Sequence, residues 1–405
     1  MHRTMPKPAL LLAALPLLLS ACAAPTAAEP SQPAATPHGY VAGAQENPEP
    51  QTGLLTVDSA TGEARLLSLL TGVTSDAGPF GKVDALRQDG RYALVTTPEH
   101  VEVFDTGAWT VDHGDHAHYY SSEPRTVGTI EVPDPGSIAG DGKDLAVFSD
   151  TGGYAAVFRH KDLDAGSIDE AFRITTSAHR GMVVPYEGHF IASVAAEGSA
   201  VATGVEVRDD ANATVLALQD CQDPAASATT RVGVVLACAD AALLITEEDG
   251  TFAAERIPYP AANAGVPAAT SLEHRAGSNE LAGPAGDAGV WHLDVSARTW
   301  TLLPTPARTV AASAVGDTRR VLALGVDGVL RTLDPRTGAV TAEAPLLAPL
   351  TGSEPAVPAL RVDASRAYLS DPAGSRVLEL DYADELRAAR TFDVPAADLV
   401  LETGL

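Results

Sequence analysis

Three histidines and an aspartate fall within six residues of this sequence, in the run His113-Gly114-Asp115-His116-Ala117-His118. Neutral imidazole is the commonest protein ligand for zinc, and tetrahedral zinc sites take three or four nitrogen, oxygen or sulfur donors. Residues two apart in an extended segment share a side, so His116 and His118 can face together, as can His113 and Asp115. The run therefore predicts a Zn2+ site that needs at least one further donor from elsewhere in the chain.

A repeated pattern of short strands runs through the chain from residue 39 onward. Each copy contains an apolar strand, a turn, a second strand ending near an acidic residue, and a tight polar turn before a third strand; the copies end at Asp58, Asp105, Asp162, Asp209, Glu248, Asp294, Asp334 and Asp381. A spacing of about 46 residues is typical of β-propellers, whose blades have about four strands each. The sequence predicts an all-β fold, a single propeller of eight blades, with seven blades or a pair of β-sandwiches as alternatives. Residues 396–402 are expected to supply the missing innermost strand of the first copy and close the ring.

The histidine run follows Ala108 to Val111, which we interpret as the outermost strand of the second blade. On this interpretation the run is the connector to the third blade, and it lies on the same face as the turns between second and third strands. The next connector of this kind contains His179. His179 is therefore expected on the same face as the run, one blade along.

The run is also compatible with a solvated polar loop and with a hydrolytic zinc site, although the ligand order differs from that of metallo-β-lactamase-like hydrolases. The sequence has no Gly-x-Ser-x-Gly elbow, no phosphate-binding loop and no Cys-x-x-Cys pair. We therefore expect a protein that is not an enzyme. The alternatives are a propeller that serves only protein–protein contact and a metal-dependent propeller hydrolase or lactonase using carboxylates such as Asp84, Asp134 and Asp363.

The beginning of the chain has the layout of a bacterial secretory signal. Basic residues precede an apolar run of about 11 residues, from Ala9 to Leu19, which is too short to span a bilayer as a helix. Leu19-Ser20-Ala21-Cys22 resembles the lipobox of bacterial lipoproteins. We predict a signal peptide over 1–21, a lipid anchor on Cys22, a Pro- and Ala-rich tether over 22–38 and the propeller over 39–405. The protein is thus expected outside the cytoplasm, attached to the cell membrane.

The cysteine count and the net charge indicate how the cysteines are paired and which partners are excluded. With Cys22 lipidated, Cys221 and Cys238 are left, and in an oxidising compartment such a pair predicts a disulfide, with two free thiols as the alternative. The net charge of −26 argues against a nucleic-acid partner, because binding phosphates requires clustered Lys and Arg. We expect a monomer.

The histidine run and its surroundings resemble a known family. The run with Tyr119-Tyr120, the preceding stretch 103–111, and Asp89-Gly90-Arg91-Tyr92 are similar to the AztD-type zinc metallochaperones, over about residues 85 to 130. These are extracytoplasmic propellers that pass zinc to the solute-binding protein of a zinc ABC importer. The resemblance implies Zn2+ binding at His116 and His118, with His179 as a third ligand and Asp115 as a further donor or outer partner. The sequence departs from the family in keeping only His38 near the mature N-terminus and Arg180 beside His179.

Overall fold

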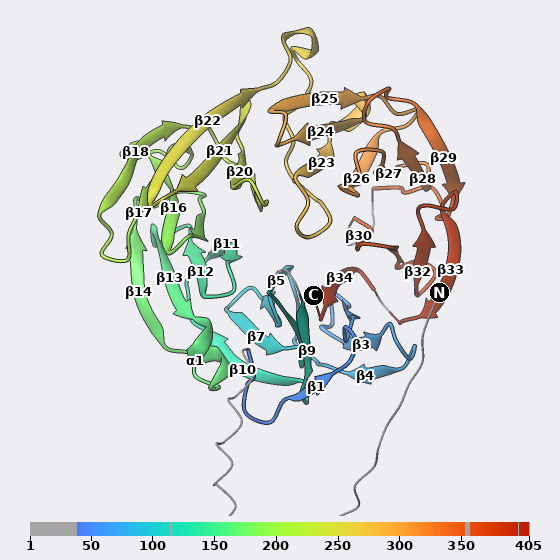
Figure 1. Ribbon diagram of the computed structural model, residues 1–405, viewed down its shortest axis with the longest axis horizontal. Coiled ribbons are helices and arrows are strands. Elements are labelled where there is room, and N and C mark those ends of the chain that lie inside the picture. Colours follow the sequence, from blue (N-terminus) through green and yellow to red (C-terminus); the bar gives the residue numbers. More distant parts are fainter. Residues whose placement is uncertain (1–38, 114–115, 353–356, 396, 405) are drawn as a thin grey trace, which may run out of the picture. The chain divides into compact units, whose positions relative to one another are not determined.

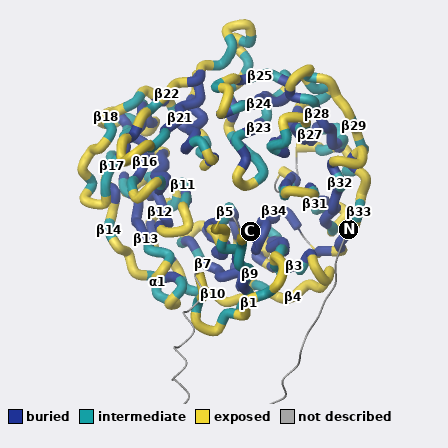
Figure 2. Tube along the Cα trace, in the orientation of Figure 1, coloured by how far each residue is buried: buried dark blue, intermediate teal, exposed yellow. Residues whose placement is uncertain are grey.

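The strands differ in burial according to their place in each sheet. In the computed structural model every residue of second strands such as β2 (Gly53–Val57), β6 (Tyr92–Thr96) and β12 (Asp144–Ser149) is buried. Last strands such as β18 (Thr214–Asp220) and β33 (Arg387–Asp393) are largely exposed. A strand reads as a continuous apolar run when both of its faces are covered. Each sheet is thus covered on both faces by its neighbours, while its last strand faces solvent at the rim (Figure 2).

The structure describes residues 39–113, 116–352, 357–395 and 397–404. Within the unit Val41–Leu405, the described residues form nine sheets, and eight of them are arranged as a ring (Figure 1) around a central cavity. The signal peptide, Cys22, the tether and Asp115 lie outside the described residues, and the predictions made for them stay predictions. Among the residues that are described, no helix is long and apolar enough to cross a membrane.

The eight sheets are the blades of the propeller, and we number them in ring order. Blade 1 consists of β34 (Leu399–Thr403), β2, β3 (Ala64–Ser68) and β4 (Thr74–Asp76), and blade 2 of β5 (Ala85–Asp89), β6, β7 (Val101–Asp105) and β10 (Arg125–Ile130). Blade 3 consists of β11 (Pro135–Gly140), β12, β13 (Tyr154–Arg159) and β14 (Glu170–Thr175), and blade 4 of β15 (Val183–Tyr186), β16 (His189–Ala195), β17 (Ala202–Arg208) and β18.

Blade 5 consists of β19 (Ala226–Thr229), β20 (Val234–Ala237), β21 (Ala241–Glu248) and β22 (Thr251–Pro258), and blade 6 of β23 (Glu280–Pro284), β24 (Val290–Asp294) and β25 (Thr299–Leu303). Blade 7 consists of β26 (Thr309–Ala314), β27 (Val321–Gly325), β28 (Val329–Leu333) and β29 (Val340–Pro345), and blade 8 of β30 (Leu360–Val362), β31 (Ala367–Asp371), β32 (Arg376–Asp381) and β33. The described helices are short: α1 (His160–Asp164), η1 (Ala261–Asn263) and η2 (Gly286–Ala288). The prediction of an all-β propeller with eight blades is confirmed.

The C-terminal strand closes the ring, as the sequence predicted. β34 pairs antiparallel with β2, in a register that places Leu401 opposite Leu55 and Val400 opposite Thr56. Val400 and Leu401 are only 2% and 5% exposed, and burying such a side chain contributes about 1.5–3 kcal/mol. The pairing provides hydrogen-bond partners for the backbone groups at an edge of the first blade that would otherwise be open. It also joins the last part of the chain to the first blade.

Neighbouring blades are joined by shared apolar clusters. Leu94 and Val103 of blade 2 pack in one cluster with Leu145 and Phe158 of blade 3. A corresponding cluster joins blade 8 to blade 1 across the closure, and it includes Val377, Phe392, Leu54 and Val400. Because each blade buries its faces against its neighbours, the ring is a rigid support for its surface loops.

The second blade departs from the prediction in one respect. Its outermost strand is β10, not Ala108 to Val111. That segment belongs to β8 (Ala108–Asp112), which forms a hairpin with β9 (Ala117–Ser121); β1 (Gln45–Asn47) adds a third strand beside β9. The described histidines of the run therefore lie at the tip of a hairpin inserted between the third and fourth strands of blade 2, and not in a connector between blades.

The predicted disulfide is present. Cys221 follows β18 of blade 4 and Cys238 follows β20 of blade 5; the two are joined with a Cα–Cα distance of 5.1 Å and a sequence separation of 17. Both residues are buried, at 0% and 1% exposure. The bond thus ties two consecutive blades together near one face of the ring.

Replacing both cysteines with alanine should lower the free energy of unfolding by about 3 kcal/mol, because a loop of this length loses its closure in the unfolded chain. Chemical denaturation of the oxidised protein and of the Cys221→Ala, Cys238→Ala variant measures the difference. Adding a reductant should destabilise the parent protein and leave the variant unchanged. Equal midpoints for all these samples would contradict the stabilising role of the bond.

Candidate metal centre

The direction of each strand decides on which face of the ring a connection lies. Strands alternate within a blade, so the connections between first and second and between third and fourth strands share one face, which we call the hairpin face. The β8–β9 hairpin leaves the end of β7 on this face. Thr110 Oγ1 donates to the carbonyl oxygen of Gly404 at 3.0 Å, next to the end of the innermost strand β34 on the same face.

His179 lies on the opposite face. It precedes β15, in the connection between the outermost strand of blade 3 and the innermost strand of blade 4. Its Nδ1 lies 2.6 Å from the carbonyl oxygen of Ser177 and its Nε2 lies 2.8 Å from Ser193 Oγ, and only 3% of the residue is exposed. The expectation that His179 shares a face with the run is wrong, because the run is not a connector between blades. The structure does not bring His179 to the other histidines.

A buried ion pair and two aromatic rings anchor the hairpin to the ring. Arg91, in the turn after β5, donates from Nε to Asp105 Oδ1 at 2.9 Å, and both side chains are buried. The guanidinium carbon of Arg91 lies 3.8 Å from the centre of the Trp109 ring on β8. Trp109 in turn stacks on Tyr120 of β9, with ring centres 5.4 Å apart. One cation thus contacts the end of β7 and the root of the hairpin.

A glycine allows the chain to turn from β7 into the hairpin. Gly107 has a φ of +75°, a conformation that side chains with a Cβ rarely adopt. A Cβ at this position would lie 2.4 Å from the carbonyl oxygen of Ser122, which directly follows β9. The two arms of the hairpin therefore meet too closely at its base for any larger residue.

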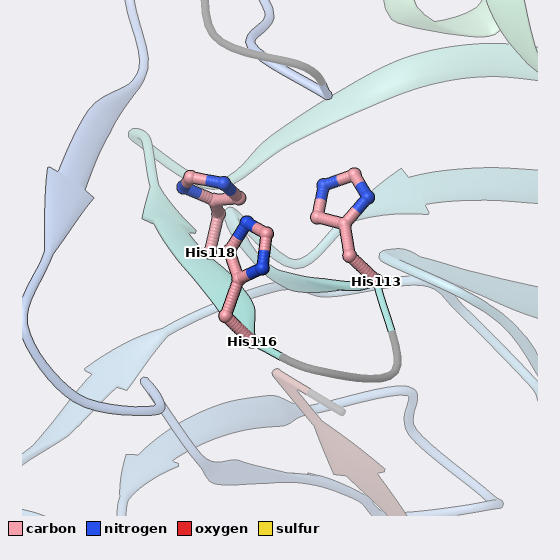
Figure 3. A group of neighbouring side chains, drawn as sticks. All are labelled: His113, His116 and His118. Carbon is pink, nitrogen blue, oxygen red and sulfur yellow. The ribbon is translucent and has the colours of Figure 1, made fainter.

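The tip of the hairpin brings together His113, His116 and His118 (Figure 3). One ring nitrogen from each of the three lies within 4.8 Å of the others. The ring centres are 4.9 to 5.3 Å apart, and the backbone N–H of His113 donates to the carbonyl oxygen of His116 at 2.9 Å. In the described part of the chain this is the one group of three or more His, Cys, Asp or Glu residues close enough to hold a metal ion.

The donor set fits zinc. With Zn–N bonds of about 2.0–2.1 Å, tetrahedral nitrogen donors lie about 3.4 Å apart. The three imidazoles need to close by roughly 1.5 Å at most, which changes of exposed side-chain torsions can supply. His113 and His116 are exposed and His118 is half-buried, so the three imidazoles can be reached from solvent.

A fourth side chain reaches the cluster from a distant part of the sequence. Glu46 Oε1, on β1, lies 2.7 Å from Nδ1 of His118. Sequence reasoning missed this residue, because Glu46 precedes the first blade and only strand pairing brings it to the hairpin. β1 has only three residues, all of them polar, so no alternation of polar and apolar side chains marks it as a strand.

The central cavity is separate from this centre. It has a volume of about 790 Å3 and is lined by the innermost strands and the segments before them, with Arg87, Arg361, Glu273 and Glu402 among its charged residues. Burial raises the pKa of Glu402 to about 7. Asp84, Asp134 and Asp363, the carboxylates considered for a propeller enzyme, are not among the described residues that line it. The structure therefore does not bring these three carboxylates together in the cavity.

Fold and site together define an eight-bladed β-propeller with a three-histidine candidate metal centre on a hairpin. The solved structures similar to it include AztD from Citrobacter koseri, with a TM-score of 0.76 and 19% identity over 87% of this chain and 98% of that one. The apo form of the same protein gives a TM-score of 0.75 and 18% identity over the same shares. Dihydro-heme d1 dehydrogenase NirN is more distant, with a TM-score of 0.57 and 14% identity over 88% of this chain and 76% of that one. No protein-family model and no curated protein matches the sequence. The chain has the fold of AztD.

Replacing Arg91 with alanine should lower the free energy of unfolding by about 3 kcal/mol, because it leaves the Asp105 carboxylate buried without its main partner. Arg125→Ala is the matched control, since Arg125 lies 3.5 Å from the same carboxylate but is 47% exposed, and it should cost less than about 1 kcal/mol. Thermal and denaturant unfolding of the two variants provide the comparison. An equal loss of unfolding free energy in the two variants would show that the hairpin does not depend on the buried pair.

Proposed function

We propose that this chain is a zinc metallochaperone, which captures Zn2+ outside the cytoplasmic membrane and passes it to the solute-binding protein of a zinc ABC importer. The observation that carries the proposal is the cluster of His113, His116 and His118 on a hairpin of a propeller with the fold of AztD. The similarity of the run and of residues 85 to 130 to the AztD-type metallochaperones supports the same function.

The position of the cluster suits transfer of a metal ion. Three imidazoles provide affinity, and their exposure on a surface hairpin lets donors of a partner approach one at a time. The ring below the hairpin stays rigid, so ligand exchange needs to move only the tip. His179 has no part in this mechanism, because it lies on the opposite face with both ring nitrogens engaged.

The place of action follows from the predicted N-terminus. A lipid on Cys22 and the predicted tether over 22–38 would hold the propeller close to the membrane that contains the importer. Restricting both partners to the same surface raises their effective concentration, so transfer can be efficient with weak docking.

A soluble fragment of residues 39–405 should bind one Zn2+, and the His116→Ala, His118→Ala variant should lose stoichiometric binding. Removing two of three ligands should weaken binding by more than the roughly 100-fold that loss of an outer partner costs. Metal analysis after dialysis and competition with a chromophoric chelator provide the measurement.

Two control variants separate this centre from the other histidines. His100→Ala changes a half-buried histidine in a turn on the opposite face, and His179→Asn keeps a polar side chain beside Ser193; both should bind zinc as the parent does. Absence of bound zinc in the parent protein would instead favour a propeller that serves only protein–protein contact.

Zinc should pass to the importer's solute-binding protein faster than it dissociates into solution, because exchange occurs within a docked complex. Stopped-flow transfer to the metal-free partner is compared with transfer to an excess of a small chelator. A rate that saturates with partner concentration above the dissociation rate is expected. A rate equal to that of dissociation, at every partner concentration, would rule out direct transfer.

A further inference from the structure

The contact between Glu46 and His118 joins the three-histidine cluster to a strand outside the propeller blades. Glu46 Oε1 and His118 Nδ1 are 2.7 Å apart, although 72 residues separate them. The His118 side chain is 25% exposed and that of Glu46 is 47% exposed. The carboxylate is thus within hydrogen-bonding distance of the imidazole at the edge of the hairpin, partly shielded from water.

The strand β1 determines where this carboxylate lies. β1 pairs antiparallel with β9, and Glu46 is opposite Tyr120. His118 is two residues before Tyr120 on β9, and residues two apart on a strand share a face. His118 is therefore the diagonal neighbour of Glu46, and a long side chain can bridge the distance between diagonal neighbours. Asn47 Nδ2 donates to Ser121 Oγ at 2.9 Å, which helps to hold the register of this short pairing.

The contact leaves the other nitrogen of His118 available to a metal. Figure 3 shows one ring nitrogen of His118 on the side of the other two imidazoles, while the second points away from them. Because Nδ1 faces Glu46, the nitrogen on the side of the cluster is Nε2. A carboxylate that accepts a hydrogen bond from Nδ1–H keeps the proton on that atom, so the lone pair stays on Nε2. It also fixes the plane of the ring and makes Nε2 a stronger donor.

We propose that Glu46 is a positioning residue of the candidate metal centre, which holds His118 in the tautomer and orientation that present Nε2 to the ion. The affinity effect rests on the proposed zinc function. The orientation of His118 does not, because the contact joins two side chains of the chain itself. The first described strand after the predicted tether thereby becomes part of the centre.

Nitrogen NMR of the imidazoles tests the orientation directly. In the metal-free fragment, labelled with 15N-histidine and studied at a pH where imidazoles are neutral, His118 should carry its proton on Nδ1. In Glu46→Ala it should shift toward the form with the proton on Nε2. Zinc affinity of this variant should fall roughly 10- to 100-fold while the stoichiometry of one ion is retained.

Two further variants make the test specific to the carboxylate. Glu46→Gln keeps the shape and an oxygen that can accept from Nδ1–H, so its tautomer and affinity should lie between those of the parent and Glu46→Ala. Glu49→Ala removes an exposed carboxylate three residues along the same segment, and it should change neither quantity.

The outcomes distinguish this inference from the proposed function. An unchanged His118 tautomer in Glu46→Ala would overturn the positioning role, even if zinc affinity fell, because Glu46 would then act as a ligand or through its charge alone. The expected tautomer shift in a protein that binds no zinc would support the orienting contact and overturn the metallochaperone proposal.

Discussion

The alternation of strand direction within each blade is the constraint on which the arrangement of this protein depends. Once β34 pairs with β2 and the ring is closed, every connection is assigned to one face or the other, and no loop can change face without reversing a strand. The closing strand also covers the edge of the first blade and completes the cluster between blades 8 and 1. The ring is consequently rigid, and the chemistry of the chain depends on what is inserted between its strands.

The histidine hairpin is one such insertion, and its position depends on a few buried contacts at its root. Arg91 and Asp105 pair where water is excluded, and the same guanidinium packs on Trp109. Buried charges are tolerated only when they are paired, so this pair favours a single docked position of the hairpin. The tip projects beyond these contacts and keeps its imidazoles accessible. Rigidity at the root and access at the tip both suit the proposed metallochaperone function, in which the site holds an ion and also releases it.

The three-stranded sheet β1–β9–β8 places a carboxylate beside an imidazole by backbone pairing alone. Glu46 reaches His118 because β1 lies along β9, and the same pairing joins the start of the described chain to the hairpin. The candidate centre is therefore composite: its imidazoles come from six consecutive positions of the sequence, whereas the partner that orients one of them comes from a segment ahead of the first blade. The opposite face, with His179 held between Ser177 and Ser193, has a structural histidine in place of a ligand.

By itself, the sequence determined the features that depend on local pattern or on counting. The repeat of about 46 residues predicted eight blades, the apolar segment 396–402 predicted the closing strand, and the pair Cys221 and Cys238 predicted the disulfide. The spacing of the run predicted that His116 and His118 lie together, whereas their grouping with His113 was found only in the structure. Each of these predictions depends on strand periodicity or on residues close together in the chain, and both can be read from the sequence alone.

Only the tertiary structure decided which face the run occupies and which side chains surround it. Three strands, β8, β9 and β10, follow β7 in the structure, and only β10 pairs with β7 as the outer strand of blade 2. The choice depends on hydrogen bonds with β7 and on the Arg91 contacts, which form between residues far apart in the sequence. For the same reason Glu46 was missed and His179 was misplaced, since neither position follows from any local pattern.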